Sequence, residues 1–248
     1  METTLALAPP SVPLFLRSFY RTNPVLAVLA LAHVLLVPVE LGLLALDTRR
    51  LDGASVWLKP LRFDVSIAIF AVSMAFVMAP LGRELSRRFA NRISVMMAIE
   101  TISIALQAAR GVRSHFNNTS AFGAAVFTVM GIAILYNTYV VFRVLLLYLR
   151  TPDLPVGPLM RRAVVLGLTA TLIGSGIGGY MSALNAHSGV HGGDLRVAHA
   201  IALHGLQLLL VAGLVLKRMK WQASTQRLLL DAAFVSHLAL TTLVVFGA

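Results

Sequence analysis

Five polar residues recur at helical spacing inside one apolar stretch of this 248-residue chain: Glu100, Ser103, Gln107, Arg110 and Ser114. Because each residue of a helix is turned by about 100° from the one before it, these side chains share one face. A carboxylate near the middle of a membrane-spanning helix costs at least about 3 kcal/mol unless it has a partner or faces water. The stripe predicts a polar cavity in which Glu100, Gln107 and Arg110 are candidate catalytic residues and Glu100 handles protons. A hydrogen-bonded seam that only fixes helix packing is the alternative.

Three histidines, His33, His204 and His237, lie near the midpoints of separate apolar stretches, and therefore near the middle of a bilayer. A histidine at that depth is neutral, paired with an acid or bound to a cofactor. Two imidazoles on facing helices are one way to ligate haem b. The three are therefore candidate haem-binding residues, with Arg62 and Arg196 near the rim as partners for the haem propionates. A proton relay and hydrogen bonding within the core are the alternatives.

A second set of histidines is expected at one end of the bundle, where His115, His187, His191 and His199 lie together with Asp194. Imidazole and carboxylate are the usual ligands of Fe, Cu and Zn. The spacing matches no standard zinc motif, so the prediction depends on the fold bringing the residues together. We predict a transition-metal site formed by His115, His191, Asp194 and His199. Solvated loop histidines are the alternative for His187 and His191.

The composition identifies an integral membrane protein. Apolar residues make up 58% of the chain and charged residues 12%, against about 45–50% and about 25% in soluble domains. The absence of cysteine excludes a disulfide scaffold. Seven apolar stretches are near or above the roughly 20 residues that cross a membrane. Their predicted limits are 24–46, 61–81, 92–112, 121–148, 159–183, 195–217 and 227–247. We predict an all-α fold, a seven-transmembrane-helix bundle formed by residues 21–248 as one domain after a lead of residues 1–20.

Basic residues are distributed unequally between the two sets of loops. The lead and the loops after the second, fourth and sixth stretches carry 14 of the 21 Lys and Arg residues: Arg17, Arg21, Arg83, Arg87, Arg88, Arg92, Arg143, Arg150, Arg161, Arg162, Lys217, Arg218, Lys220 and Arg227. Because Lys- and Arg-rich loops stay in the cytoplasm, we predict a cytoplasmic N-terminus, an extracytoplasmic C-terminus and a place in a bacterial inner membrane. The net charge of +11 is then a topology signal, and no nucleic-acid partner is expected.

These features support several functions. The first is a membrane redox or electron-transfer protein that binds haem or a metal through histidines near the extracytoplasmic half of the bundle. The second is a proton-coupled transporter that uses the polar stripe, and the third is a metal-dependent membrane hydrolase. A structural or assembly factor is the fourth. A retinal protein is not expected, since Lys59, Lys217 and Lys220 all lie at span edges. The expected partners are the lipid bilayer and a small-molecule or quinone-like substrate.

Two regions of the sequence resemble segments of uncharacterised bacterial multi-pass membrane proteins. The first comprises residues 107–111 (QAARG) and 114–117 (SHFN), and the second is 192–199 (GGDLRVAH). The resemblance implies a membrane location and about seven spans over most of the chain, and it carries no activity.

Overall fold

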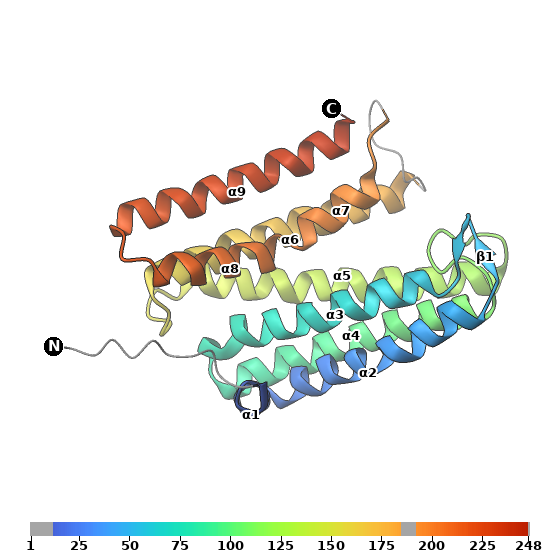
Figure 1. Cartoon of the computed structure of the whole chain (residues 1–248), viewed down its shortest axis with the longest axis horizontal. Coiled ribbons are helices and arrows are strands. Elements are labelled where there is room, and N and C mark those ends of the chain that lie inside the picture. Colours follow the sequence, from blue (N-terminus) through green and yellow to red (C-terminus); the bar gives the residue numbers. More distant parts are fainter. Residues whose placement is uncertain (1–11, 185–191, 248) are drawn as a thin grey trace.

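The computed structural model describes residues 12–184 and 192–247. In this part of the chain seven helical segments are long and apolar enough to cross a membrane, which confirms the predicted number of spans. The helices are α1 (Val12–Thr22), α2 (Pro24–Leu46), α3 (Leu58–Met78), α4 (Arg83–Ala109), α5 (Ala121–Arg150), α6 (Pro158–Leu184), α7 (Leu195–Leu203), α8 (Gly205–Arg218) and α9 (Ala223–Phe246) (Figure 1). The remaining elements are a short hairpin and a 3-10 turn. The hairpin has two strands of two residues each, β1 (Arg50–Leu51) and β2 (Ala54–Ser55), and the 3-10 turn is η1 (Ala79–Leu81).

Two spans differ most from their predicted form. α4 begins at Arg83 rather than at residue 92, because its first turns form a charged helical extension in which Arg88 pairs with Glu84 one turn away. The sixth span, Leu195–Arg218, is broken between α7 and α8 at His204 and Gly205. The second half of the predicted lead is itself a helix, α1.

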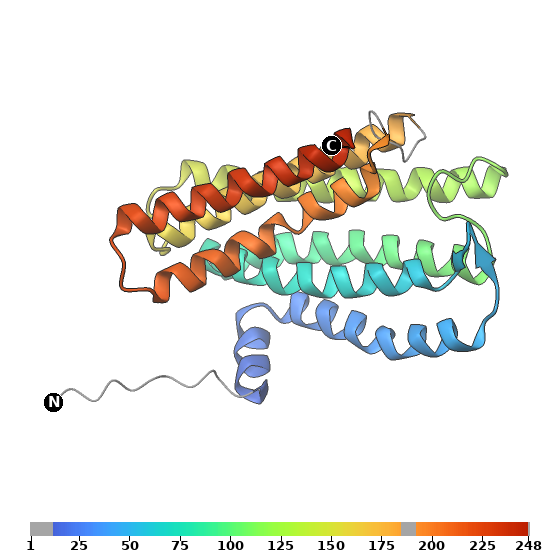
Figure 2. The same cartoon turned by 45° about the horizontal axis from the view of Figure 1, so that its top comes forward.

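The long helices run side by side in two groups. α2, α3 and α4 form the first group, α6, α7, α8 and α9 form the second, and α5 lies between them (Figures 1 and 2). α5 packs against both α4 and α6 and so joins the groups, while α3 also contacts α8. α1 lies across one end of the bundle, and the β1–β2 hairpin lies at the other (Figure 2). We call the second of these the hairpin end. It also holds the end of α4, the start of α5 and the start of α7.

Side-chain caps fix where several helices begin. Asn23 accepts a hydrogen bond from the Leu26 amide at 3.1 Å, and Pro24 stands at the first helical position of α2. Asn23 also donates to Ser86 Oγ on α4 at 3.0 Å, which ties the corner between α1 and α2 to the bundle. Ser120 caps α5 in the same way, through the Gly123 amide at 3.0 Å.

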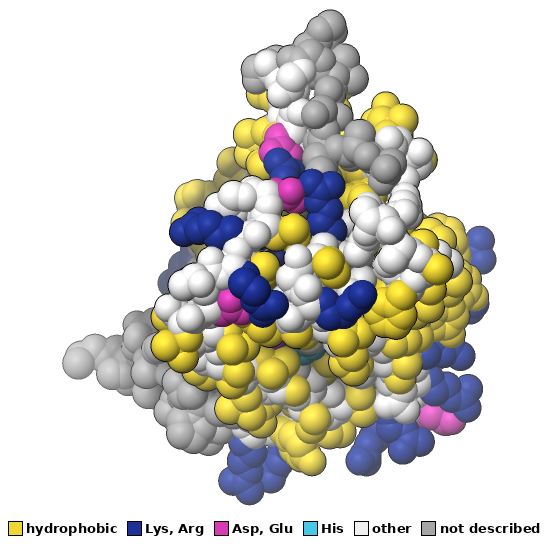
Figure 3. Space-filling view, turned by 90° about the vertical axis from the view of Figure 1, so that its right-hand side faces the viewer, with side chains coloured by type: hydrophobic (Ala, Val, Ile, Leu, Met, Phe, Trp, Pro, Cys, Tyr) yellow, Lys and Arg dark blue, Asp and Glu magenta, His cyan; other side chains and the backbone are white. Residues whose placement is uncertain are grey.

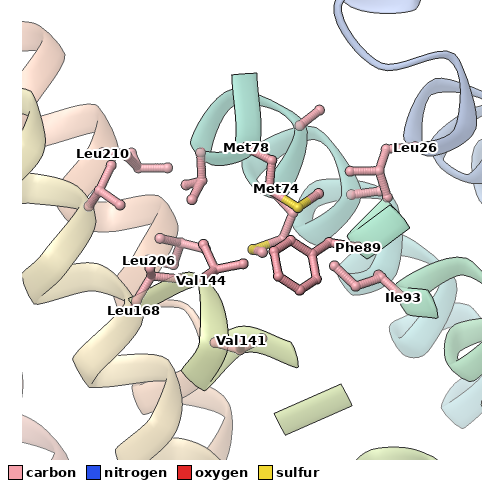
Figure 4. Close-up of a cluster of buried hydrophobic side chains, with 14 of the residues drawn as sticks. Leu26, Met74, Met78, Phe89, Ile93, Val141, Val144, Leu168, Leu206 and Leu210 are labelled. Carbon is pink, nitrogen blue, oxygen red and sulfur yellow. The ribbon is translucent and has the colours of Figure 1, made fainter. Parts of the chain in front are cut away.

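The apolar core lies where the two groups meet, towards the end opposite the hairpin. Met74 and Met78 of α3 lie between Phe89 of α4 and the side chains of α5 and α8, with Leu206 among them (Figure 4). Tyr148 of α5 is buried there and donates to the Val77 carbonyl at 2.7 Å. The outer faces of the helices carry many exposed large apolar residues, as expected for surfaces that contact lipid. α9 is the most peripheral span, since only 17% of its most apolar segment is buried inside the protein.

Candidate functional site

The loop 110–120, between α4 and α5, is held against the hairpin end by polar contacts. Arg113 donates to both carboxylate oxygens of Asp52 in the hairpin turn, at 2.6 and 2.9 Å. Asn117 is buried and donates to the Arg113 carbonyl at 2.8 Å. Phe116, with φ 56°, takes a left-handed conformation that turns the chain sharply. His115 lies between these fixed points, so its position is set by the loop rather than by a helix.

The His115 imidazole lies between a cation and a buried acid. Its Nδ1 is 2.9 Å from Lys59 Nζ, in the first turn of α3, and its Nε2 is 3.2 Å from Glu100 Oε1 on α4. An ammonium group only donates hydrogen bonds, so Nδ1 must accept from Lys59. The hydrogen of the neutral ring is then on Nε2, directed at Glu100. The three side chains are thus linked in series: Lys59 contacts His115, and His115 contacts Glu100.

Phenylalanine rings surround this imidazole. The centroids of Phe63, Phe116 and Phe127 lie 5.9, 6.3 and 6.1 Å from that of His115. Burial lowers the pKa of His115 below its ordinary value; the hydrogen bond to Glu100 acts in the opposite direction, and the Lys59 charge lowers the pKa further. His115 is therefore neutral near pH 7, in the form that can accept at one nitrogen and donate at the other.

Glu100 is the buried member of the Lys59–His115–Glu100 series. It lies within α4 and is only 1% exposed. Its Oε1 lies 3.2 Å from His115 Nε2, and in the described part of the chain Oε2 has no hydrogen-bond partner. A carboxylate this deep is costly unless a neighbouring group compensates its charge. Of the ionisable groups in the polar stripe predicted from the sequence, this is the one that the structure buries most completely.

The rest of the stripe forms a separate contact. Arg110 donates to Gln107 Oε1 at 2.6 Å, and its guanidinium lies 4.5 Å from the centroid of the Phe122 ring. Gln107 is fully buried, whereas Arg110 is exposed. In the described part of the chain Gln107 Nε2 has no partner. Gln107 and Arg110 therefore contact each other, and the partner that Glu100 receives is His115 rather than either of them.

Ion pairs lie around the Lys59–His115–Glu100 series at the rim of the hairpin end, where Figure 3 shows basic and acidic side chains side by side. Asp47 accepts from Arg49 and from Trp57 Nε1, the latter at 2.8 Å, and the Arg49 contact is the main reason that the Asp47 pKa lies well below its usual range. Arg49 also donates to the Ala109 carbonyl at the end of α4, at 2.8 Å. Exposed pairs of this kind each stabilise the fold by at most about 1 kcal/mol. Their effect here is to fix the hairpin beside the loop that carries His115.

The three histidines predicted to bind haem have different surroundings. His33 is buried, and its Nδ1 lies 2.6 Å from Asp64 Oδ1 on α3. His237 is buried against Gly205, at the break between α7 and α8, while His204 is exposed. No contact between any two of these rings is present among the described residues. Haem binding through them stays a prediction.

The residues predicted to bind a metal are only partly in the described structure, since His191, like His187, falls in 185–191. Asp194 caps α7 through the Arg196 and Val197 amides and pairs with the exposed Arg196 side chain at 3.2 Å. His199 donates from Nδ1 to the Gly174 carbonyl at 2.7 Å and interacts electrostatically with His115. Within the described ranges no three His, Asp or Glu side chains are arranged to hold a metal ion. Arg62, predicted to bind a haem propionate, is exposed on α3.

Sequence reasoning missed one part of this site. Lys59 was expected only at the edge of a span, but its ammonium lies 5.6 Å from the Phe63 centroid and contacts His115. One signal was available: Lys59, Phe63 and Ser66 share a helical face, so the lysine belongs to the same side of α3 as an aromatic ring.

The chain was compared with models of known protein families, with curated proteins and with solved structures, and none of them matches it.

Proposed function

We propose that this protein is a membrane transporter that moves protons, in which Glu100 is the proton-carrying acid and His115 delivers protons to it. The observation that supports this is the placement of His115, which contacts Lys59 with one nitrogen and Glu100 with the other. A neutral imidazole can accept a proton at one nitrogen while it donates from the other, which makes it a suitable relay.

The relay conserves protons at each step. His115 gives the hydrogen on Nε2 to the Glu100 carboxylate and takes one at Nδ1 from the Lys59 ammonium. This leaves a neutral carboxylic acid, a neutral imidazole with its hydrogen on Nδ1, and a neutral amine. Water at the rim then returns a proton to Lys59, which is partly exposed. A turn of the ring, or proton transfer in the reverse direction, restores the starting state.

The phenylalanine rings have a defined role in this scheme. Phe63, Phe116 and Phe127 pack around the imidazole, so in this scheme the ring itself is the route by which protons reach Glu100. Burial of the ring favours its neutral form at rest. Protonation of Glu100 removes a buried negative charge, and this change alters the balance between conformations that differ in how they solvate the acid.

Proton flux into liposomes tests the proposal. A potassium gradient with valinomycin supplies the driving force, and an enclosed pH dye reports the flux. We expect flux above that of protein-free vesicles, and we expect Glu100→Gln to reduce it by about 100-fold or more. Glu84→Gln is the matched control, because Glu84 lies on the same helix with its side chain 71% exposed. Equal flux in the wild type and in Glu100→Gln would contradict the proposal.

A further inference from the structure

A second group of buried ionisable side chains lies between α2 and α3, apart from His115 and Glu100. His33 and Glu40 are seven residues apart on α2, so they lie two turns apart on one face. Asp64 of α3 contacts His33 and interacts electrostatically with Glu40. The residues are 3%, 5% and 0% exposed, respectively. Three titratable groups at this depth must compensate one another's charge, because lipid and core cannot.

The contacts within this group differ in kind. His33 Nδ1 lies 2.6 Å from Asp64 Oδ1, which is the distance of a strong charge-assisted hydrogen bond. Glu40 interacts with Asp64, through the charge of that carboxylate and through a side-chain hydrogen bond. In the described part of the chain the remaining oxygens, Asp64 Oδ2 and Glu40 Oε2, have no hydrogen-bond partner. Two nearly inaccessible carboxyl groups are thus adjacent, with one imidazole to balance them.

Two carboxylates in contact cannot both stay ionised in a site of low dielectric constant, since their repulsion and desolvation add. If Glu40 holds a proton and donates it to Asp64, and His33 is an imidazolium, the group carries no net charge. If that proton leaves, a net negative charge remains inside the membrane. We propose that His33, Asp64 and Glu40 form a second proton-binding site, in which Glu40 and Asp64 share one exchangeable proton and His33 supplies the balancing charge.

Charged groups on neighbouring elements do not supply that balance. The buried acid of α4, Glu100, contacts His115 instead. Arg62, on α3 itself, is exposed, as are Arg17 and Arg21 of α1. A metal cation fits the site less well than a proton, because within the described ranges His33, Asp64 and Glu40 do not form a group that could hold a metal ion. This inference does not depend on transport, since the shared proton is a property of the folded chain at rest.

Infrared spectroscopy of the full chain in lipid nanodiscs tests for the shared proton. A protonated carboxylic acid has a C=O stretch that is separate from that of a carboxylate and shifts in D2O. We expect this band near neutral pH in the wild type and in Glu100→Gln, and we expect Glu40→Gln to remove it. Glu84→Gln is the control for the same substitution at an exposed site. The Glu100 variant separates this test from that of the proposed function, because a band from Glu100 would disappear with that substitution alone.

Asp64→Asn gives a second test if Glu40→Gln does not fold. The amide cannot share a proton with Glu40 as a carboxylate does, so we expect the band to shift and the chain to bind one proton fewer over the titration. Absence of the band in the wild type, or its survival unchanged in both variants, overturns the inference. Loss of the band when sodium is added at constant pH also overturns it, because the occupant would then be a metal cation.

Discussion

Glu100 Oε1 lies 3.2 Å from His115 Nε2, although His115 belongs to the loop that follows the same helix. Glu100 is nine residues before the end of α4, which is about 14 Å along the helix axis. The loop therefore returns into the bundle to reach the acid, and its contacts with Asp52 and within the turn hold it there. His115, which lies outside the predicted spans, thus reaches the same depth in the bundle as Glu100, which lies inside one.

The first prediction concerns the pH dependence of stability. The pKa of His115 is lowered in the folded protein, mainly by burial, and lies near 6.5 in the unfolded chain. Between these two values the unfolded state binds more protons, so the free energy of unfolding rises with pH. The contribution is complete above about pH 6.5 and is lost as the pH falls towards the folded value. Thermal unfolding in detergent between about pH 5 and pH 8 measures it.

Substitution identifies the part of that slope that belongs to His115. His115→Asn should flatten the dependence of the melting temperature on pH in this range. His204→Asn, at an exposed position, is the matched control and should leave the slope in place. A variant at position 115 with the full slope of the wild type would show that the imidazole is not buried in the folded protein.

The second prediction concerns the packing of the His199 ring, from α7, against Gly178 of α6. A Cβ at Gly178 would lie 2.8 Å from His199 Cε1 and 3.1 Å from Nδ1, so Gly178→Ala must displace the ring. We expect a loss of about 1–3 kcal/mol in the free energy of unfolding. Gly176→Ala on the same helix meets nothing within 4 Å and should be neutral or slightly stabilising. Chemical denaturation in mixed micelles compares the two, and equal stability would mean that His199 does not pack on Gly178.

The third prediction concerns the corner between α1 and α2. Asn23 is 2% exposed, caps α2 and bonds to Ser86. Asn23→Ala removes both interactions, and we expect it to cost about 1–2 kcal/mol. Ser86→Ala removes only the second and should cost less, about 1 kcal/mol. The same denaturation measurement applies. A larger loss for Ser86→Ala than for Asn23→Ala would rule out the cap as the main contribution.

The spans could be predicted from the sequence because apolar length is a strong local signal. The burial of Glu100 and Gln107 also followed from their spacing, since one helix face must turn inward if a carboxylate is to avoid lipid. Helical arithmetic placed these two residues correctly without any knowledge of the neighbouring helices, whereas Arg110, which it placed on the same face, is exposed.

The partners could not be predicted in this way. His115 reaches Glu100 through the path of a loop, and no periodicity describes a loop. His33 pairs with Asp64 because α2 packs on α3, whereas the sequence grouped it by depth with His204 and His237. Depth places residues at a level in the membrane, but it does not say which helices are neighbours. Lys59 was missed for the same reason, because an edge position predicts exposure unless a loop folds over it.

The central claim is that an imidazole at position 115 carries protons to Glu100, and chemical rescue of the proton flux tests it most directly. His115→Ala should lower the flux into liposomes by about 100-fold, and free imidazole in the buffer should restore part of it by entering the space that the ring has left. His204→Ala, the control, should keep wild-type flux and give no response to imidazole. Wild-type flux in His115→Ala, or a loss of flux that imidazole does not relieve, would contradict the account.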